Sequence, residues 1–318
     1  MQEKNDDFIN VLPPEMVEKI VDYLKPKELV KAALASKETF FVYAQRKLAI
    51  NKKAHELSTD VAHGKQAEAE QFLKELPIGQ AQEVLLTAVP FTDYSNRTFH
   101  CTAYEYAYWA KDTHMCRMLE KQMDADTKMS MLKRCEAIEK EGLTYKQHGV
   151  EVKGSKHFDF EPLKTALTNY VQGYNNWSNT ENYTAMKAAW MAVGLAQRDV
   201  PVHVINEYCR PDRSFYPRPE FDEPTLPRVL TYYDYRAGEN KAVFPLVSDS
   251  SGLGVDFACG RGRGGVCRGN VRQRPRAGRG CADLAAVSRL DEVRTADLTQ
   301  SRENLRSTEP EQSRGMTY

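Results

Sequence analysis

Apolar positions in the first 45 residues recur at helical spacing and are interrupted twice. Pro13 and Pro14 suit the entry of a helix, because proline is tolerated in the first turn. Lys25-Pro26 ends that helix, and Ser36 is a plausible N-cap for a third one. The apolar side chains at helical spacing are Met16, Val17, Ile20, Val21, Tyr23, Leu24, Leu29, Val30, Ala33, Leu34, Phe40, Phe41 and Tyr43. The pattern predicts three short helices, which bury little surface by themselves and need neighbours or a partner.

Residues 50–135 are predicted to continue as pairs of helices. The stretches 61–76 and 102–119 lie about forty residues apart, which suggests a degenerate helical repeat. Glycines at 142, 149 and 154 predict a loop-like insert over 142–156. Helical patterning returns at 162–171 and at 181–197.

The helical pattern ends after Cys209, where prolines become frequent. Five prolines between 211 and 227 interrupt helices. Two strands are predicted at 230–235 and 242–247, joined by a turn that contains Gly238. Residues 260–280 are mostly Gly and Arg and are expected to be disordered, with a helix resuming at 283–297. A reading-frame error around 259–281 is the alternative explanation of this composition.

These patterns predict a mainly α fold in four parts. We expect a helical module at 1–48 and a helical-repeat domain at 49–210. A proline-rich segment with a small β-hairpin follows at 211–258, and a largely disordered tail at 259–318.

Composition narrows the class of protein. Lys plus Arg equals Asp plus Glu, at 44 each, so net charge favours neither a nucleic acid nor a membrane as partner. No apolar run approaches the ~20 residues of a membrane span, and no signal-peptide core opens the chain. Seven cysteines without a Cys-x-x-Cys pair favour reduced thiols in a cytosol-like compartment.

No cofactor or metal is expected. The glycines at 260, 262 and 265 have the Gly-x-Gly-x-x-Gly spacing, but no helix follows them as a dinucleotide site requires. His100, His114 and His157 lack metal-ligand spacing to one another or to a cysteine pair.

The segment from Leu12 to Tyr43 resembles an F-box. It opens with Leu-Pro-x-Glu, contains a helix break, and closes with Ser36-Lys37. It departs from the family pattern at Ala35, where many members have Val, and at Thr39, where many have Trp. The alternative is an amphipathic hairpin that packs on its own domain.

The resemblance implies a docking role. In that family the matching positions bind a Skp-family adaptor, which in turn binds a cullin complex. The residues carried over are Leu12, Pro13, Glu15, Ile20, Leu24, Leu29 and Ser36.

The 102–119 stretch resembles one ankyrin repeat. Thr102 occupies the opening Thr of the family, Ala107 its Ala, and Leu119 closes the second helix. Lys111 replaces the usual Gly, which commonly supplies a left-handed turn. The resemblance implies a surface that binds a protein target, and generic helix packing is the alternative.

An F-box followed by ankyrin-like helices resembles secreted bacterial effectors of the Legionella type. The blocks 208–221 and 250–257 also resemble the end of one such effector family. This resemblance implies type IV secretion and action in a host cytosol.

We therefore expect a non-catalytic substrate adaptor of a cullin–RING (SCF-type) ubiquitin ligase. A rival from another class is a Cys-His hydrolase that uses Cys209 and His203, with Asp212 nearby, although papain-like and caspase-like flanking motifs are absent. A helical scaffold without a ligase link is a third possibility. The sequence leaves the protein target unidentified.

Overall fold

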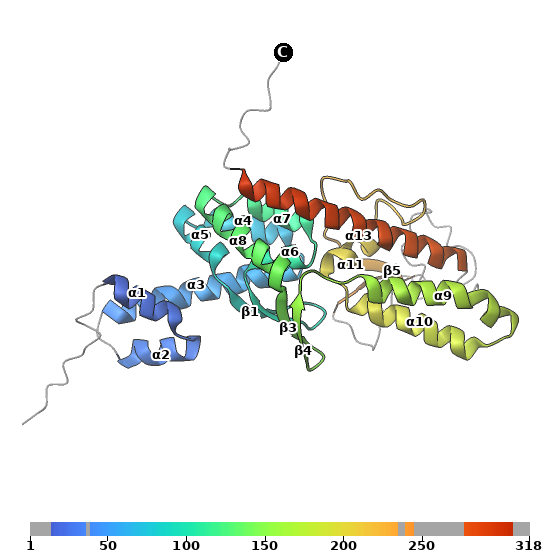
Figure 1. Cartoon of the computed structure of the whole chain (residues 1–318), viewed down its shortest axis with the longest axis horizontal. Helices are drawn as coiled ribbons and strands as arrows, with labels where there is room; N and C mark the ends of the chain where they lie inside the picture. The colour runs from blue at the N-terminus through green and yellow to red at the C-terminus, as the bar shows by residue number, and fades with distance from the viewer. Residues whose placement is uncertain (1–13, 36–38, 235–238, 245–276, 308–318) are drawn as a thin grey trace, which may run out of the picture.

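The computed structural model describes residues 14–35, 39–234, 239–244 and 277–307, which are mainly helical. The molecule is elongated, with α1 and α2 at one end and the α9–α10 pair at the other (Figure 1). The helices are α1 (Pro14–Tyr23), α2 (Pro26–Ala35), α3 (Thr39–Ala62), α4 (Gln66–Glu75), α5 (Ile78–Leu86), α6 (Ala103–Trp109), α7 (Thr113–Glu120), α8 (Ala125–Glu141), α9 (Glu161–Asn179), α10 (Tyr183–Arg198), α11 (Val202–Cys209) and α13 (Ala277–Arg306). The strands are β1 (Val89–Thr92), β2 (Thr98–Cys101), β3 (Leu143–Gln147), β4 (Val150–Ser155), β5 (Thr231–Asp234) and β6 (Glu239–Ala242).

The first three helices form the N-terminal module, residues 14–48, whose third helix is longer than predicted. Its small core consists of Val17, Val21, Leu29 and Ala44. Helix α3 then continues without a break through residue 48 and contributes Ile50 to the next core. The predicted domain boundary at 48 therefore falls inside a helix, because the chain has no glycine or proline between Thr39 and Ala62.

The central core lies between α3–α8 and a four-stranded antiparallel sheet of order β1-β2-β3-β4. The aromatic side chains of Tyr104, Tyr106, Tyr108 and Trp109 on α6 are at most 2% exposed. They are core residues of a helix that packs on both sides.

The sheet corrects two expectations. Residues 89–101 form the hairpin β1–β2 instead of continuing the helix pairs, and residues 143–155 form the hairpin β3–β4 instead of a loop. His148 (φ 50°) and Gly149 (φ 79°) form the turn between β3 and β4, and both need the left-handed region that such two-residue turns favour. At Gly142 a Cβ atom would lie 2.2 Å from the Gly154 carbonyl carbon, so only glycine fits there. The glycines that predicted a loop instead permit a tight hairpin.

The stretch that resembles an ankyrin repeat forms the helix pair α6–α7. The Thr102 hydroxyl accepts from the Glu105 N–H, and the Glu105 carboxylate accepts from the Thr102 N–H, which completes a capping box. Lys111 between the helices has φ 61°, so it adopts the left-handed turn without glycine; Gly64, between α3 and α4, has φ 72°. However, α5 and β1–β2 lie between these two pairs, so they do not follow one another as consecutive repeats.

The C-terminal core unites parts of the chain that were predicted to be separate. It contains buried side chains from α9, α10, α11, the 215–221 segment and α13. The predicted boundaries at 210 and 258 therefore do not separate domains. The predicted β-hairpin is confirmed as β5–β6, with its second strand three residues earlier than expected.

Helix α13 corrects the expectation of a largely disordered tail, because residues 277–306 form one helix. The Gly/Arg-rich residues 259–276 lie outside the described part of the chain. The side chains of Val287 and Leu290 pack in the C-terminal core, and Leu298 and Leu305 pack in the central core. Figure 1 shows α13 running along both halves of the molecule. Its buried positions recur every three or four residues from Val287 to Leu305, and they include the polar side chains of Arg294 and Ser301.

The described helices are all too short or too polar to span a lipid bilayer.

Replacing Leu290 by Ala tests whether α13 is part of the folded core. Leu290 is fully buried, so loss of its packing should lower the free energy of unfolding by about 2–5 kcal/mol. Urea denaturation followed by circular dichroism measures this change. The control Thr299→Ala is on an exposed position of α13 and should change stability by less than about 0.5 kcal/mol. Equal stability of the two variants contradicts the docking of α13.

Candidate functional site

Helix α1 carries two apolar stripes on different faces. Val17 and Val21 are at most 3% exposed and pack toward α3, together with the partly buried Leu24. Met16, Ile20 and Tyr23 are 51%, 38% and 88% exposed and follow the same i, i+4, i+7 spacing one face away. A helix that only covers its own core needs one stripe, so the second is available to a partner.

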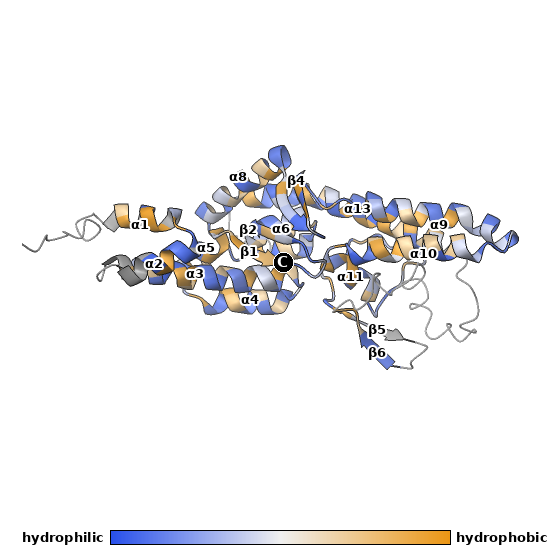
Figure 2. Ribbon diagram, turned by 90° about the horizontal axis from the view of Figure 1, so that it is seen from below, coloured by the Kyte–Doolittle hydropathy of each residue, from blue (hydrophilic) through white to orange (hydrophobic). Residues whose placement is uncertain are grey.

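Exposed apolar side chains are concentrated in the N-terminal module. We name Met16, Ile20, Tyr23, Val30, Phe41 and Val42 the N-terminal apolar surface. In the rest of the described chain six large apolar side chains are comparably exposed, scattered from Ile78 to Tyr216. Half of these side chains thus belong to a module of about 35 residues. Figure 2 colours the ribbon by hydropathy and shows hydrophobic and hydrophilic residues alternating along α1. Such a concentration typically marks a protein-binding surface.

The residues predicted to bind an adaptor have different environments. Ile20 is on the N-terminal apolar surface, and Leu24 is half-buried beside it. Leu29 is fully buried in the module, so its predicted contact with a partner is corrected: it supports α2 from inside, and α2 exposes Val30 instead.

The other predicted residues are less fully defined. Glu15 belongs to α1, but the position of its side chain is not described. Leu12, Pro13 and Ser36 lie outside the described residues.

Local hydrogen bonds fix the bend between α1 and α2. The Lys25 N–H donates to the Glu28 carboxylate at 2.8 Å, and the Leu29 N–H donates to the Lys25 carbonyl at 2.9 Å. Pro26 is at the first helical position, where its missing N–H has no cost. The predicted helix break is therefore a capped start of α2, and it sets the angle at which α1 meets the module.

The Cys-His pair proposed for the rival hydrolase is not assembled. Cys209 and His203 are both on α11 and are 2% and 1% exposed. Six residues along a helix separate them by about 9 Å along the axis and place them on different faces. Asp212 is half exposed and accepts from Arg210 rather than from His203. A nucleophile and its base must be within hydrogen-bond reach, so this arrangement does not support catalysis by these groups.

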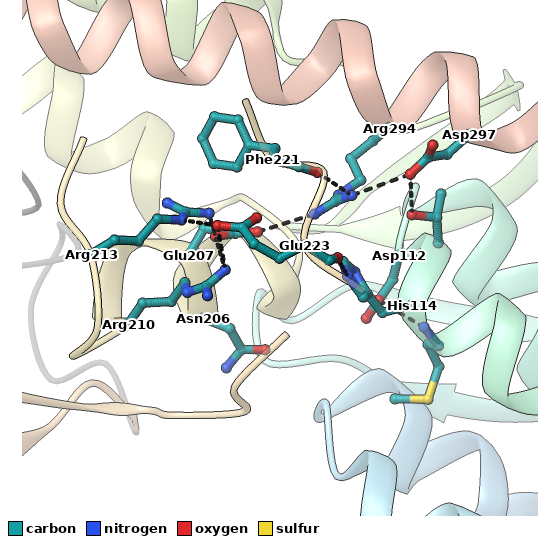
Figure 3. A network of polar contacts seen from close by, with 12 residues as sticks. Asp112, His114, Asn206, Glu207, Arg210, Arg213, Phe221, Glu223, Arg294 and Asp297 are labelled. Carbon is teal, nitrogen blue, oxygen red and sulfur yellow. Dashed lines mark hydrogen bonds and ion pairs between the residues drawn. The ribbon is translucent and has the colours of Figure 1, made fainter. Parts of the chain in front are cut away.

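A polar cluster lies where the central and C-terminal cores meet, and we name it the junction network (Figure 3). It begins at Asp112, whose carboxylate caps α7 by accepting from the Met115 N–H. Arg228 donates to both oxygens of Asp112, at 2.8 and 2.9 Å, and also to Gln66 on α4. Although burial by itself raises the pKa of Asp112, the Arg228 guanidinium reverses this effect and holds that pKa below its ordinary value.

Glu207 is the most enclosed carboxylate of the junction network. It is 0% exposed on α11 and accepts from Arg213 and Arg294, while Arg210 lies 3.7 Å away. Arg213 also donates to Glu223, whose backbone carbonyl lies 2.9 Å from His114 Nε2. Figure 3 shows these groups converging from three parts of the chain.

Arg294 extends the junction network onto α13. It donates to the Phe221 carbonyl and to Asp297, and Asp297 also accepts from the Thr113 hydroxyl on α7. The network thus ties α7, α11, the 210–228 segment and α13 together.

The junction network has the features of a structural cluster and not of a reactive site. Its arginines are neutralised by carboxylates, as in a buried ion cluster that holds a fold together. In the described ranges no three His, Cys, Asp or Glu residues are grouped to hold a metal ion. Burial also raises the pKa of the Cys101, Cys116 and Cys135 thiols, which disfavours the reactive thiolate.

Sequence reasoning missed the junction network because its members lie far apart in the chain. Arg228 and Asp112 are 116 residues apart, and Arg294 and Glu207 are 87 residues apart. The N-terminal apolar surface did have a local signal. Two interleaved i, i+4, i+7 stripes over residues 16–24 indicate that this helix lies between two apolar surfaces.

Acidification should destabilise the junction network through its buried histidines. Burial lowers the pKa of His203 to about 3 and that of His114 to about 4. Both remain neutral in the folded chain between pH 5 and 7, whereas in the unfolded chain they bind protons below about pH 6.5. Stability is therefore lost as pH falls below 6.5, by roughly 2 kcal/mol per histidine at pH 5.

The variant His203→Gln isolates this contribution. Guanidinium denaturation at pH 7 and pH 5 should show a loss about 2 kcal/mol smaller than in the wild type. His100→Gln is the control, because His100 is exposed on β2. An unchanged pH dependence in His203→Gln contradicts a neutral buried His203.

Similarity to known proteins covers most of the chain. The family model described as the CBUA0006 C-terminal domain matches residues 162–305, which run from α9 to the end of α13. Uncharacterized protein CBUA0006 of Coxiella burnetii is 38% identical over 269 residues, which cover 79% of this chain and 75% of that protein. No solved structure matches. The match to one domain across 162–305 agrees with the shared C-terminal core, and the chain belongs to the CBUA0006 family.

Proposed function

We propose that this protein is a substrate adaptor of a cullin–RING (SCF-type) ubiquitin ligase and docks on a Skp-family adaptor through its N-terminal module. One observation carries the proposal: α1 has a second, exposed apolar stripe in the segment whose sequence resembles an F-box. Met16, Ile20 and Tyr23 form that stripe, and the buried stripe keeps it in place.

The energetics of burial favour a stable complex. Burying one large apolar side chain contributes about 1.5–3 kcal/mol relative to leaving it in water. The three exposed side chains of α1, and Val30, Phe41 and Val42 elsewhere in the module, are 38–88% exposed, so each supplies part of such a contribution. Part of that energy offsets the lost freedom of the two partners.

The remainder of the chain would hold the target. No bond chemistry by this protein is needed, because tethering a target beside the ligase raises its effective concentration. The resemblance to secreted effectors supports a host cytosol as the proposed setting of this activity. The buried positions of Cys209 and His203 give the rival hydrolase no support.

Adaptor binding tests the proposal directly. The tagged full-length chain should retain a purified Skp-family adaptor, and the double variant Met16→Ser, Ile20→Ser should lose at least about tenfold in affinity, or about 1.4 kcal/mol. Both side chains are exposed, so the fold should be preserved, which circular dichroism verifies. Isothermal calorimetry measures the affinity.

The matched control is Val150→Ser, which removes an exposed apolar side chain (62%) from β4, outside the module. It should bind the adaptor as the wild type does. A second variant, Leu12→Ala with Pro13→Ala, probes the opening of the F-box pattern. Failure of the wild type to retain the adaptor, or equal retention by the Met16/Ile20 variant, leaves a helical scaffold without a ligase link.

A further inference from the structure

Lysine is unevenly distributed along the chain. Nineteen of the 22 lysines precede residue 161, and the remaining three are Lys164, Lys187 and Lys241. Arginine shows the reverse distribution, with four of 22 before residue 161. The shift begins at α9, about one hundred residues before the Gly/Arg-rich stretch, so the composition of that stretch does not account for it.

The lysine-poor part coincides with a structural unit. It is the C-terminal domain, which we define as residues 161–306, and the end of it formed by α9 and α10 lies opposite α1 and α2 (Figure 1). Lys164 is engaged there with Glu161 and Asp291, and its side chain is 20% exposed.

Buried arginines of this domain have a structural reason. The guanidinium groups of Arg213, Arg228 and Arg294 each donate to two or more acceptors in the junction network. An ammonium group is a compact point charge and does not reproduce this planar, forked geometry.

Exposed arginines of the same domain have no such reason. The side chains of Arg218 and Arg289 are 53% and 33% exposed. Both pair with the exposed Glu220, and Arg289 also pairs with the exposed Glu292 one turn along α13. A surface pair of this kind contributes little, and lysine makes it as well as arginine does. Packing therefore does not explain why these positions lack lysine.

Ubiquitin transfer distinguishes the two side chains. A deprotonated lysine amine attacks the carbonyl carbon of the ubiquitin thioester on a carrier cysteine; the N–C isopeptide bond forms, the C–S bond breaks, the nitrogen loses a proton, and the carrier leaves as a thiol. A guanidinium stays protonated at any physiological pH and its nitrogens are not free to attack. An arginine surface thus keeps the charge and lowers the number of acceptors, of which Lys187, exposed on α10, remains.

We propose that the C-terminal domain is the part of this protein that lies within reach of the activated ubiquitin, and that its lysine-poor surface directs ubiquitin to the bound target instead of to the protein itself. This inference rests on the proposed function. It also identifies the C-terminal domain, rather than the central helices, as the side on which the target is held.

Restoring acceptors tests the inference. Arg218→Lys with Arg289→Lys keeps every charge, and the control Arg46→Lys with Arg134→Lys changes two arginines of similar exposure, 59% and 36%, in the lysine-rich half. Each full-length variant is incubated with Skp-family adaptor, cullin–RING complex, activating and carrier enzymes, ATP and ubiquitin. Mass spectrometry locates the modified lysines.

The C-terminal variant should gain at least about fivefold in self-conjugation, at the introduced lysines, because they are tethered near the carrier. The control should remain at the wild-type level. Equal conjugation of both variants, or wild-type conjugation mainly on lysines before residue 161, overturns the inference while adaptor binding still supports the proposed function. Failure of the wild type to bind the adaptor removes both.

Discussion

The complete burial of the Glu207 carboxylate constrains much of this structure. An ion inside a protein costs several kcal/mol unless opposite charges and hydrogen bonds replace its water. Here the replacements come from Arg213, in the segment after α11, and from Arg294 on α13. Helix α11 can therefore occupy its position only when that segment and α13 are in place. This requirement explains why a helix 70 residues further along the chain belongs to the same core.

In the N-terminal module the groups that need partners are apolar, because apolar surface left in water also has a cost in free energy. Val17 and Val21 satisfy one face of α1 within the chain, whereas Met16 and Tyr23 on another face remain in water. The junction network has its charges compensated internally, and the module does not have its apolar surface covered. The N-terminal module is therefore the better candidate for binding a partner. The junction network has more hydrogen bonds, but they are all made within the chain.

The sequence predicted the structural features that are determined by residues close together in the chain. The helix break at Pro26 and the β5–β6 hairpin both rest on signals within a few residues. The strands β1–β4 were missed, because four to six residues carry little periodicity and the glycines around β3–β4 resemble a loop. The packing of α13 and the pairing of Arg228 with Asp112 depend on contacts across more than one hundred residues, which no local pattern contains.

Helix α3 has a consequence for how such proteins evolve. It ends the N-terminal module and begins the central core without a loop, with Ala44 in one and Ile50 in the other. Each residue inserted in a helix rotates everything beyond it by about 100° and advances it by 1.5 Å. Recombination at this junction must therefore add or remove whole helical turns to preserve the relative orientation of the two parts.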